Sequence, residues 1–237
     1  MDANTPLRRP RQAARRSTVS RREQADATRV LLLRTAERLY AEYGLSEVSN
    51  RQIVEAAGQG NNSALAYYFG SRAELIRAIA SFHGEPIARR IQQLVEEARD
   101  STDPRDHIAS LVLPYTEHLA ELGHPTWYAR FTAQICADPT LGPDELAAPM
   151  QAPLFRKAIV SVRSQAPRLS PKVAALRSQS MRLVVIHTCA EHERAAAFTG
   201  RSADWTMMGD ALVDIVTGML LAPPHSRPTR RRRPSTS

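Results

Sequence analysis

The stretch GNNSALAYYFG, residues 60–70, combines amide, hydroxyl and phenol side chains within a short apolar segment. Asparagine amides match the acceptor and donor that adenine presents in the major groove, and phenol hydroxyls donate to phosphates. Helical spacing turns Leu65 and Phe69 inward and leaves the polar side chains outside. We therefore expect this segment to contact nucleic acid, and its candidate residues are Asn61, Asn62, Ser63, Ala64, Tyr67 and Tyr68.

The run HTCAEHE, residues 187–193, holds histidine, cysteine and glutamate and raises the question of a metal or a nucleophile. On a helix His187 and Glu191 share one face, whereas Cys189 and Glu193 share a face that points nearly the opposite way. Zinc needs three or four converging ligands, and a cysteine nucleophile needs an oriented base. The sequence also lacks a glycine-rich phosphate loop. We therefore predict no metal, no cofactor and no catalytic residue.

Positive charge is concentrated at the two ends of the chain. The 237 residues carry a net charge of +8, with +5 in residues 1–30, +5 in residues 225–237 and −2 in residues 31–224. Arginine-rich ends attract polyanions, either nucleic acid or an anionic membrane surface, through counterion release. A disordered, solubilising tail without a specific partner is the alternative for TRRRRPSTS at the end of the chain.

Cysteine content and hydropathy bound the compartment. Cys136 and Cys189 are the only cysteines, and their separation fits neither a disulfide framework nor paired zinc spacing. The N-terminus lacks the apolar region of a signal peptide. Residues 211–222 form the best membrane candidate, but the segment is too short to span and contains Asp214. We expect a cytoplasmic protein with no membrane partner.

Three N-terminal helices are expected to position the polar segment. A helix ending at Gly44 is predicted by apolar residues at helical spacing, which are Leu32, Leu33, Ala36, Leu39, Tyr40 and Tyr43. Ser49 and Gln52 form a capping box that opens a second helix, which stops at Gly58. Two short helices separated by a glycine-containing turn and held on a longer first helix make a helix-turn-helix arrangement. In that arrangement the second short helix enters the major groove.

The rest of the chain is also predicted to be helical, so the fold class is all-α. Ser71 and Glu74 form a second capping box that starts a long helix, which Gly84 and Pro86 should kink or break before it continues to about Ala98. Further helices are expected near residues 104–122, 125–137, 143–165, 170–198 and 203–222. The predicted divisions are a basic flexible arm (1–24), a helix-turn-helix domain (25–84), a C-terminal ligand-binding and dimerisation domain (85–222) and a basic flexible tail (223–237).

Residues 29–79 resemble the DNA-binding domain of the TetR family of transcriptional regulators. The matching features are Gly44 after an aromatic end, Ser49 with Ile53 and Ala57-Gly58, the run Tyr67-Tyr68-Phe69, and the Ser71-Arg72…Glu74-Leu75 helix start. The turn departs from the family pattern, because Gln59-Gly60 replaces the usual residues and one extra residue precedes Leu65. With the helix start of Ser49 offering backbone amides to a phosphate, the remaining DNA-contact candidates are Ser49, Arg51, Gln52 and Arg72.

The resemblance implies a homodimer that binds a palindromic double-stranded DNA operator and a small-molecule effector. It places the dimer interface in the expected helices 170–198 and 203–222. The effector would be moderately apolar, and candidate pocket residues are Tyr115, His118, Trp127, Tyr128, Phe131 and His187. These aromatic residues could equally be ordinary core.

The most consistent function is a sequence-specific transcriptional regulator, a dimeric repressor relieved by its ligand. A constitutive DNA-architectural dimer with weak sequence preference is the alternative that the basic ends allow. A small helical enzyme is disfavoured because no catalytic constellation is present. The sequence leaves open the effector, the operator and the choice between repressor and activator.

Overall fold

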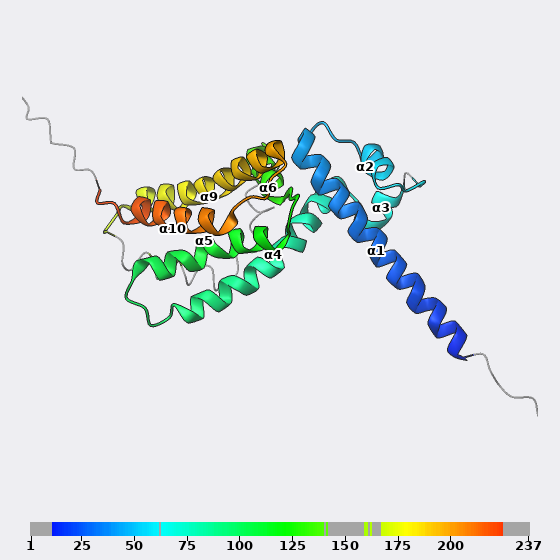
Figure 1. The fold of residues 1–237 in the computed structure, drawn as a ribbon, viewed down its shortest axis with the longest axis horizontal. Coiled ribbons are helices and arrows are strands. Elements are labelled where there is room, and N and C mark those ends of the chain that lie inside the picture. Colours follow the sequence, from blue (N-terminus) through cyan, green and yellow to red (C-terminus); the bar gives the residue numbers. More distant parts are fainter. Residues whose placement is uncertain are drawn as a thin grey trace, which may run out of the picture.

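The chain folds into helices throughout the part that the structure describes, as the sequence predicts. This computed structural model describes residues 11–61, 63–139, 141, 159–160, 162 and 167–224, with backbone only for residues 11–19. Two groups of helices lie at opposite ends of the molecule, and one long helix runs from the first group into the second (Figure 1).

The first group, called here the reading head, consists of α1 (Arg11–Tyr43), α2 (Asn50–Ala56), α3 (Ala64–Phe69) and the start of α4 (Arg72–Glu97). Both predicted capping boxes are present, at the N-termini of α2 and α4. Between these helix starts, Gly70 ends α3 at φ +73°, where a Cβ atom would lie 2.5 Å from Glu74 Oε2. The backbone angle therefore favours a glycine there, and a larger residue would also displace the Glu74 carboxylate that caps α4.

The second group, called here the bundle, contains the rest of α4 with α5 (Pro104–Glu121), α6 (Tyr128–Ala137), α9 (Pro171–Thr199) and α10 (Trp205–Leu221). Asp103, Ser170 and Asp204 cap α5, α9 and α10 through their side chains. Each cap satisfies a backbone N–H that the helix itself leaves without an acceptor. In the bundle α10 and α4 pack on α5, and α6 packs on α9.

The structure differs from the sequence expectation along the first and the fourth helix. Residues 11–24 were expected to be flexible, whereas α1 begins at Arg11; past Pro10 the segment is rich in strong helix formers and free of proline. Of the kink or break predicted at Gly84 and Pro86, the break is wrong, because α4 continues through both residues. The apolar face of α4 remains buried on either side of Pro86, and this burial outweighs the one backbone hydrogen bond that proline removes.

Several expectations fall outside the described residues. They are the helix expected at 143–165, of which only residues 159, 160 and 162 are described, most of the tail after residue 224, and Asn62. The other predicted helices agree with α5, α6, α9 and α10 to within a few residues.

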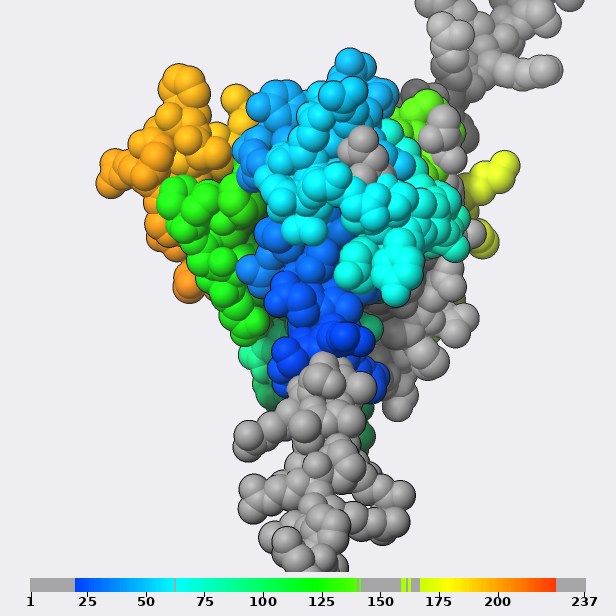
Figure 2. Space-filling view, turned by 90° about the vertical axis from the view of Figure 1, so that its right-hand side faces the viewer, coloured from blue at the N-terminus to red at the C-terminus, as the bar shows by residue number. Residues whose placement is uncertain are grey.

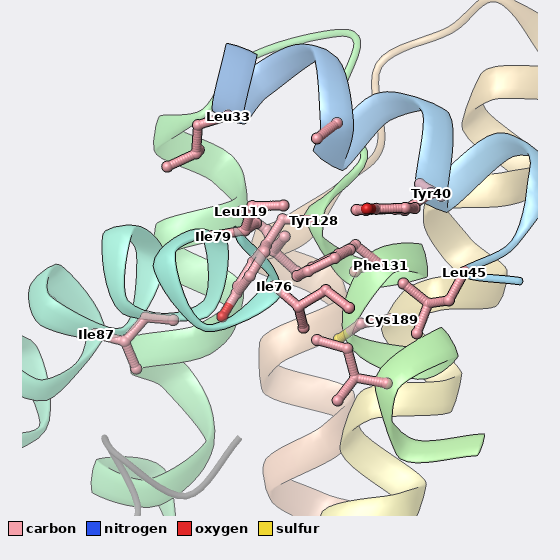
Figure 3. Packing of buried hydrophobic residues seen from close by; sticks show 14 of the residues in the cluster. Leu33, Tyr40, Leu45, Ile76, Ile79, Ile87, Leu119, Tyr128, Phe131 and Cys189 are labelled. Carbon is pink, nitrogen blue, oxygen red and sulfur yellow. The ribbon is translucent and has the colours of Figure 1, made fainter. Parts of the chain in front are cut away.

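One apolar core continues from the reading head into the bundle. Tyr40 of α1 stacks on Phe131 of α6 with ring centroids 6.2 Å apart, and both rings are fully buried. Figure 3 shows these rings beneath α1, with Tyr128 and Leu119 of the bundle close by. The head and the bundle are therefore packed against each other rather than joined only through α4.

Candidate nucleic-acid interface and the junction behind it

The N-terminus of α2 is closed by its own side chains. Ser49 Oγ accepts from the Gln52 backbone N–H at 3.3 Å, and Gln52 Oε1 accepts from the Ser49 backbone N–H at 2.8 Å. Both residues are exposed. The amide oxygen of Gln52 is thus held by the cap, while its NH₂ group is left to donate; contact of Ser49 and Gln52 with DNA stays a prediction.

The turn between α2 and α3 is held by a local hydrogen-bonded pair. Asn61 Oδ1 accepts from the Ser63 backbone N–H at 3.0 Å and from Ser63 Oγ at 2.7 Å. This Asx turn fixes the entry into α3, and the NH₂ group of Asn61 belongs to an exposed residue. Ala64 is buried and belongs to the core. The first helical residue of α3 therefore anchors the helix, and its contact with DNA stays a prediction.

Helix α3 separates an apolar inner side from a phenolic outer side. Leu65 and Phe69 are buried, as predicted, while Tyr67 is 81% exposed and Tyr68 is half-buried. The rings of Tyr67 and Tyr68 pack edge to face, 5.0 Å apart. Seen from this end of the molecule, α2 and α3 lie over α1 and form the outer surface (Figure 2). The Tyr67 hydroxyl is accordingly available to a phosphate, with its ring braced by its neighbour.

The two arginines predicted to contact phosphates have different surroundings. Arg51 projects from α2 with 76% of its side chain exposed and pairs with Glu55 at 2.7 Å. Arg72 is half-buried; its Nη1 donates to the Val48 carbonyl oxygen at 2.9 Å, and its guanidinium lies 5.2 Å from the Tyr40 ring centroid. Arg51 is exposed, and its contact with DNA stays a prediction, whereas Arg72 ties the start of α4 to α1 and to the segment before α2.

Most of the predicted pocket residues come together as packed core. The rings of Tyr115, His118, Tyr128 and Phe131 contact one another around Tyr128. Tyr128 is buried between them, and burial raises its pKa, together with the charge of Glu37. His187 is exposed on α9 and is not part of this set. The face of α9 that lies against the bundle core carries Cys189 instead, so a role of His187 in effector binding stays a prediction.

Two residues that sequence reasoning missed join the head to this cluster. His83 of α4 stacks on Tyr128 with centroids 4.0 Å apart, and its Nε2 lies 2.9 Å from Glu37 Oε2 of α1. Its Nδ1 lies 2.8 Å from His118 Nε2 of α5. Glu37 and His83 are buried, and their positions on the apolar faces of α1 and α4 were the signal that could have identified them.

The hydrogen bonds that link Glu37, His83 and His118 run in a definite direction at the Glu37 end. A carboxylate only accepts, so His83 Nε2 carries the proton that binds Glu37. His83 Nδ1 and His118 Nε2 share one hydrogen bond, and His118 Nδ1 is buried without a partner among the described residues. Burial, followed by the neighbouring His83, lowers the pKa of His118 to about 4. His118 is therefore neutral at pH 7.

A buried carboxylate fixes α6 against α9. Glu193, which is 2% exposed, accepts from Thr126 Oγ1 at 2.7 Å, from the backbone N–H of Ala129 at 3.2 Å and from that of Arg130 at 3.0 Å. The Arg130 side chain adds a further bond at 3.0 Å. The charge is thus compensated by a guanidinium and by the N-terminus of α6, which gives Glu193 a structural role.

The remaining residues of the segment 187–193 do not converge on a site. Burial, with the charge of Glu193, raises the pKa of Cys189 to about 12, so its thiol stays protonated. In the described part of the chain no group of three His, Cys, Asp or Glu side chains is arranged to hold a metal ion. Nor does any described helix have the length and apolar character that crossing a membrane requires.

Comparison with known proteins agrees with this geometry. Residues 32–79 match the model of the bacterial regulatory proteins, tetR family. NalD of Pseudomonas aeruginosa, the secondary repressor of the MexAB-OprM multidrug efflux pump, has a similar fold, with 20% identity and a TM-score of 0.55 over 84% of this chain and 98% of that chain. A putative tetR family regulator from Shewanella sp. PV-4 has 14% identity and a TM-score of 0.54 over 82% and 96% of the two chains.

A TetR-family transcriptional regulator from Bordetella parapertussis 12822 is similar as well, with 19% identity and a TM-score of 0.54 over 82% of this chain and 94% of that chain. No curated protein sequence matches this chain significantly. The family model covers the reading head from residue 32 onward, and the structural likeness extends over the bundle. Residues 32–79 therefore match the tetR family of bacterial regulatory proteins, as a DNA-binding reading head requires, and the chain as a whole has the fold of solved tetR family regulators.

Proposed function

We propose that this regulator is a dimeric repressor that binds a palindromic operator and is released from it by a small, moderately apolar effector. The observation that carries the proposal is the division of α3, whose apolar side is buried while Tyr67 and the turn at Asn61 and Ser63 face outward. Such a helix, rigidly held from behind, is suited to the major groove.

The N-terminal part of α1 supports a role in phosphate binding. It extends away from the body of the reading head (Figure 1) and carries Arg21, Arg22 and Arg29 as exposed residues. Arg29 also lies over the Phe69 ring at the end of α3, 5.1 Å from its centroid, so the basic N-terminal part of α1 is adjacent to α3. We infer that this extension adds sequence-independent affinity, because each arginine at a phosphate releases counterions.

Dimerisation through α9 and α10 is supported by their exposed apolar side chains. Leu176 is 61% exposed and Ile215 is 51% exposed. Residues of this size are normally covered when they cluster, and a second copy of the same pair of helices would cover them symmetrically. Leu212 and Val216, by contrast, pack within the chain.

Ligand release is proposed to work by population shift. An effector that binds the bundle better in one arrangement favours a dimer whose recognition helices no longer fit adjacent grooves. Because α4 is one helix from Arg72 to Glu97, movement in the bundle is passed to the reading head along it. Pro86, where one backbone hydrogen bond is missing, is the point at which α4 bends most readily.

Selection from a random DNA pool, followed by footprinting, tests the proposal. We expect a twofold-symmetric sequence whose half-sites lie ~34–36 Å apart or at a small multiple. Tyr67→Ala should abolish protection of that sequence while the circular dichroism spectrum stays unchanged. If selection enriches no twofold-symmetric sequence, the operator proposal is contradicted. If Tyr67→Ala protects the selected sequence as the unsubstituted protein does, the role of α3 is contradicted.

A second candidate function, a constitutive architectural dimer, is favoured only by the basic extension of α1. Competition with random DNA separates the two. A specific regulator should prefer its selected site by about 10³-fold or more at physiological salt, whereas an architectural protein should show little preference.

A further inference from the structure

A small cavity lies where the reading head meets the bundle. Its volume is about 190 Å³, and its walls come from α1, the middle of α4, the end of α5 and the segment leading into α6. The residues that give it chemical character are Arg34, Glu37, Phe82, His83, Glu121 and Trp127. Trp127 is the only member of the predicted effector pocket among them, so the cavity is a separate feature of the molecule.

A buried carboxylate with a free oxygen borders this cavity. Glu37 is 5% exposed, and its Oε2 is bonded to His83 Nε2. Within the described part of the chain no donor is bonded to Glu37 Oε1. Arg34, one turn earlier on α1, is exposed and forms no ion pair with Glu37 among the described contacts. A carboxylate buried this deeply is costly unless its oxygens receive donors, and an incoming cation would supply one.

Two aromatic rings complete the walls. Phe82 is 37% exposed although it is large and apolar, and Trp127 is half-buried. The Trp127 indole Nε1 already donates to Glu42 Oε1 at 3.2 Å, so Trp127 has only its ring carbons left to offer a ligand. Aromatic ring faces attract cations, and their edges and faces alike cover apolar groups.

The charges decide the class of ligand. Glu37 and Glu121 place two carboxylates at the cavity, against the single guanidinium of exposed Arg34. An anion would meet the buried Glu37 without a compensating donor, whereas an ammonium group satisfies its free oxygen. We propose that the cavity binds a small organic ammonium ion, with its N–H groups donating to Glu37 Oε1 and its carbon skeleton against Phe82 and Trp127.

This site goes beyond the proposed regulation by an effector in the bundle. The ligand contacts α1 of the reading head on one side and the middle of α4 and the α5–α6 connection on the other, so it bridges the two parts of the molecule. Binding involves no DNA and can be measured on the protein alone. Failure of the operator proposal would therefore leave the outcome of this test unaffected.

The test uses intrinsic fluorescence of the full chain carrying Trp205→Phe, which leaves Trp127 as the only tryptophan. The probes are 2-phenylethylammonium, the uncharged 2-phenylethanol and the anionic phenylacetate, and titration calorimetry on the unsubstituted chain checks the affinities. We expect saturable binding of the ammonium ion, at least about tenfold tighter than either other probe, because only it donates with a full charge.

Three substitutions localise the binding. Glu37→Gln should weaken it by about 10- to 100-fold, since a hydrogen bond to a charged group is removed while the His83 contact keeps an acceptor. Glu121→Gln, at an exposed position, should weaken it by about two- to fivefold. Glu191→Gln makes the same charge change on the exposed side of α9 and should leave the affinity unchanged.

Absence of saturable binding, equal affinity for the three probes, or unchanged binding by Glu37→Gln would each overturn the proposal. Thermal unfolding of each variant checks its fold. If Glu37→Gln does not fold, two measurements decide the question. They are the affinities of the three probes for the unsubstituted chain and the ratio of the ammonium affinities of Glu121→Gln and Glu191→Gln.

Discussion

Arg51 and Arg72 provide a direct test of the structural assignment, because the sequence gives both the same role and the structure does not. Arg72→Ala removes the bond from Nη1 to the Val48 carbonyl oxygen at 2.9 Å and the packing against the Tyr40 ring at 5.2 Å. A hydrogen bond from a charged group and a partly exposed cation–π interaction together amount to about 2–4 kcal/mol. We expect Arg72→Ala to lower the free energy of unfolding by that amount.

Arg51→Ala should behave in the opposite way. Arg51 is exposed and paired only with an exposed Glu55 in the described structure, so the unfolding midpoint in urea should not change. Operator affinity should fall, and the slope of log K against log salt should decrease by about 0.9 for each phosphate that the variant no longer neutralises. Urea unfolding and fluorescence anisotropy over a salt series measure both quantities on both variants.

If Arg72→Ala unfolds like the unsubstituted chain and lowers the salt slope, Arg72 is a phosphate ligand in solution and does not stabilise the fold. A loss of stability in Arg51→Ala comparable to that of Arg72→Ala would be equally damaging, because it would mean that exposure on α2 does not distinguish the two residues.

Further predictions concern the bundle and the recognition helix. Glu193→Ala should cost about 3–5 kcal/mol of stability, because it leaves Arg130 and two backbone N–H groups without their buried acceptor; calorimetric unfolding that shows less than about 1 kcal/mol would contradict this role. Gly209→Ala should destabilise the fold by about 1–3 kcal/mol, since its Cβ would lie 2.6 Å from Thr116 Oγ1. The Cβ of Gly218→Ala would meet nothing within 4 Å, so this control should leave the fold as stable or more stable in thermal melts. The depressed pKa of His118, about 4, means that the unfolded chain binds the proton first; stability should fall as pH drops from about 6.5 towards 4, and His118→Asn should flatten that part of the pH profile. Tyr67→Phe should weaken binding to the operator and to random DNA by similar factors of about tenfold in anisotropy titrations, because it removes one hydroxyl donor to a phosphate. Weaker binding to the operator alone would instead assign Tyr67 to base recognition.

Local patterns made much of the reading head predictable. The capping boxes at Ser49 and Ser71 connect residues three positions apart, so their hydrogen bonds follow from the order of residues alone. The burial of Leu65 and Phe69 likewise follows from a single helical period. The order and spacing of these features also carried the family resemblance that residues 32–79 bear out.

Local patterns were less informative where a side chain has partners far away in the sequence. Arg72 precedes Glu74 in the motif and was predicted to contact a phosphate, whereas in the fold it bonds to Val48 and lies over Tyr40. His187 lies two residues before Cys189, so the two side chains are on opposite faces of α9, and His187 is exposed while Cys189 is buried. A break was predicted at Pro86 because proline removes a backbone hydrogen bond within its own helix. The burial that offsets this loss comes from packing of α4 against α5, which the local pattern does not show.

The sequence by itself determined the helical class, the helix starts and the identity of the reading head, because helix caps and periodicity act over a few residues. Only the tertiary structure decided that Glu37, His83 and His118 form one buried chain across three helices, and that Glu193 holds the start of α6. Those partners are separated by 35 to 64 residues along the chain. Their hydrogen bonds depend on how whole helices pack, which no local pattern encodes.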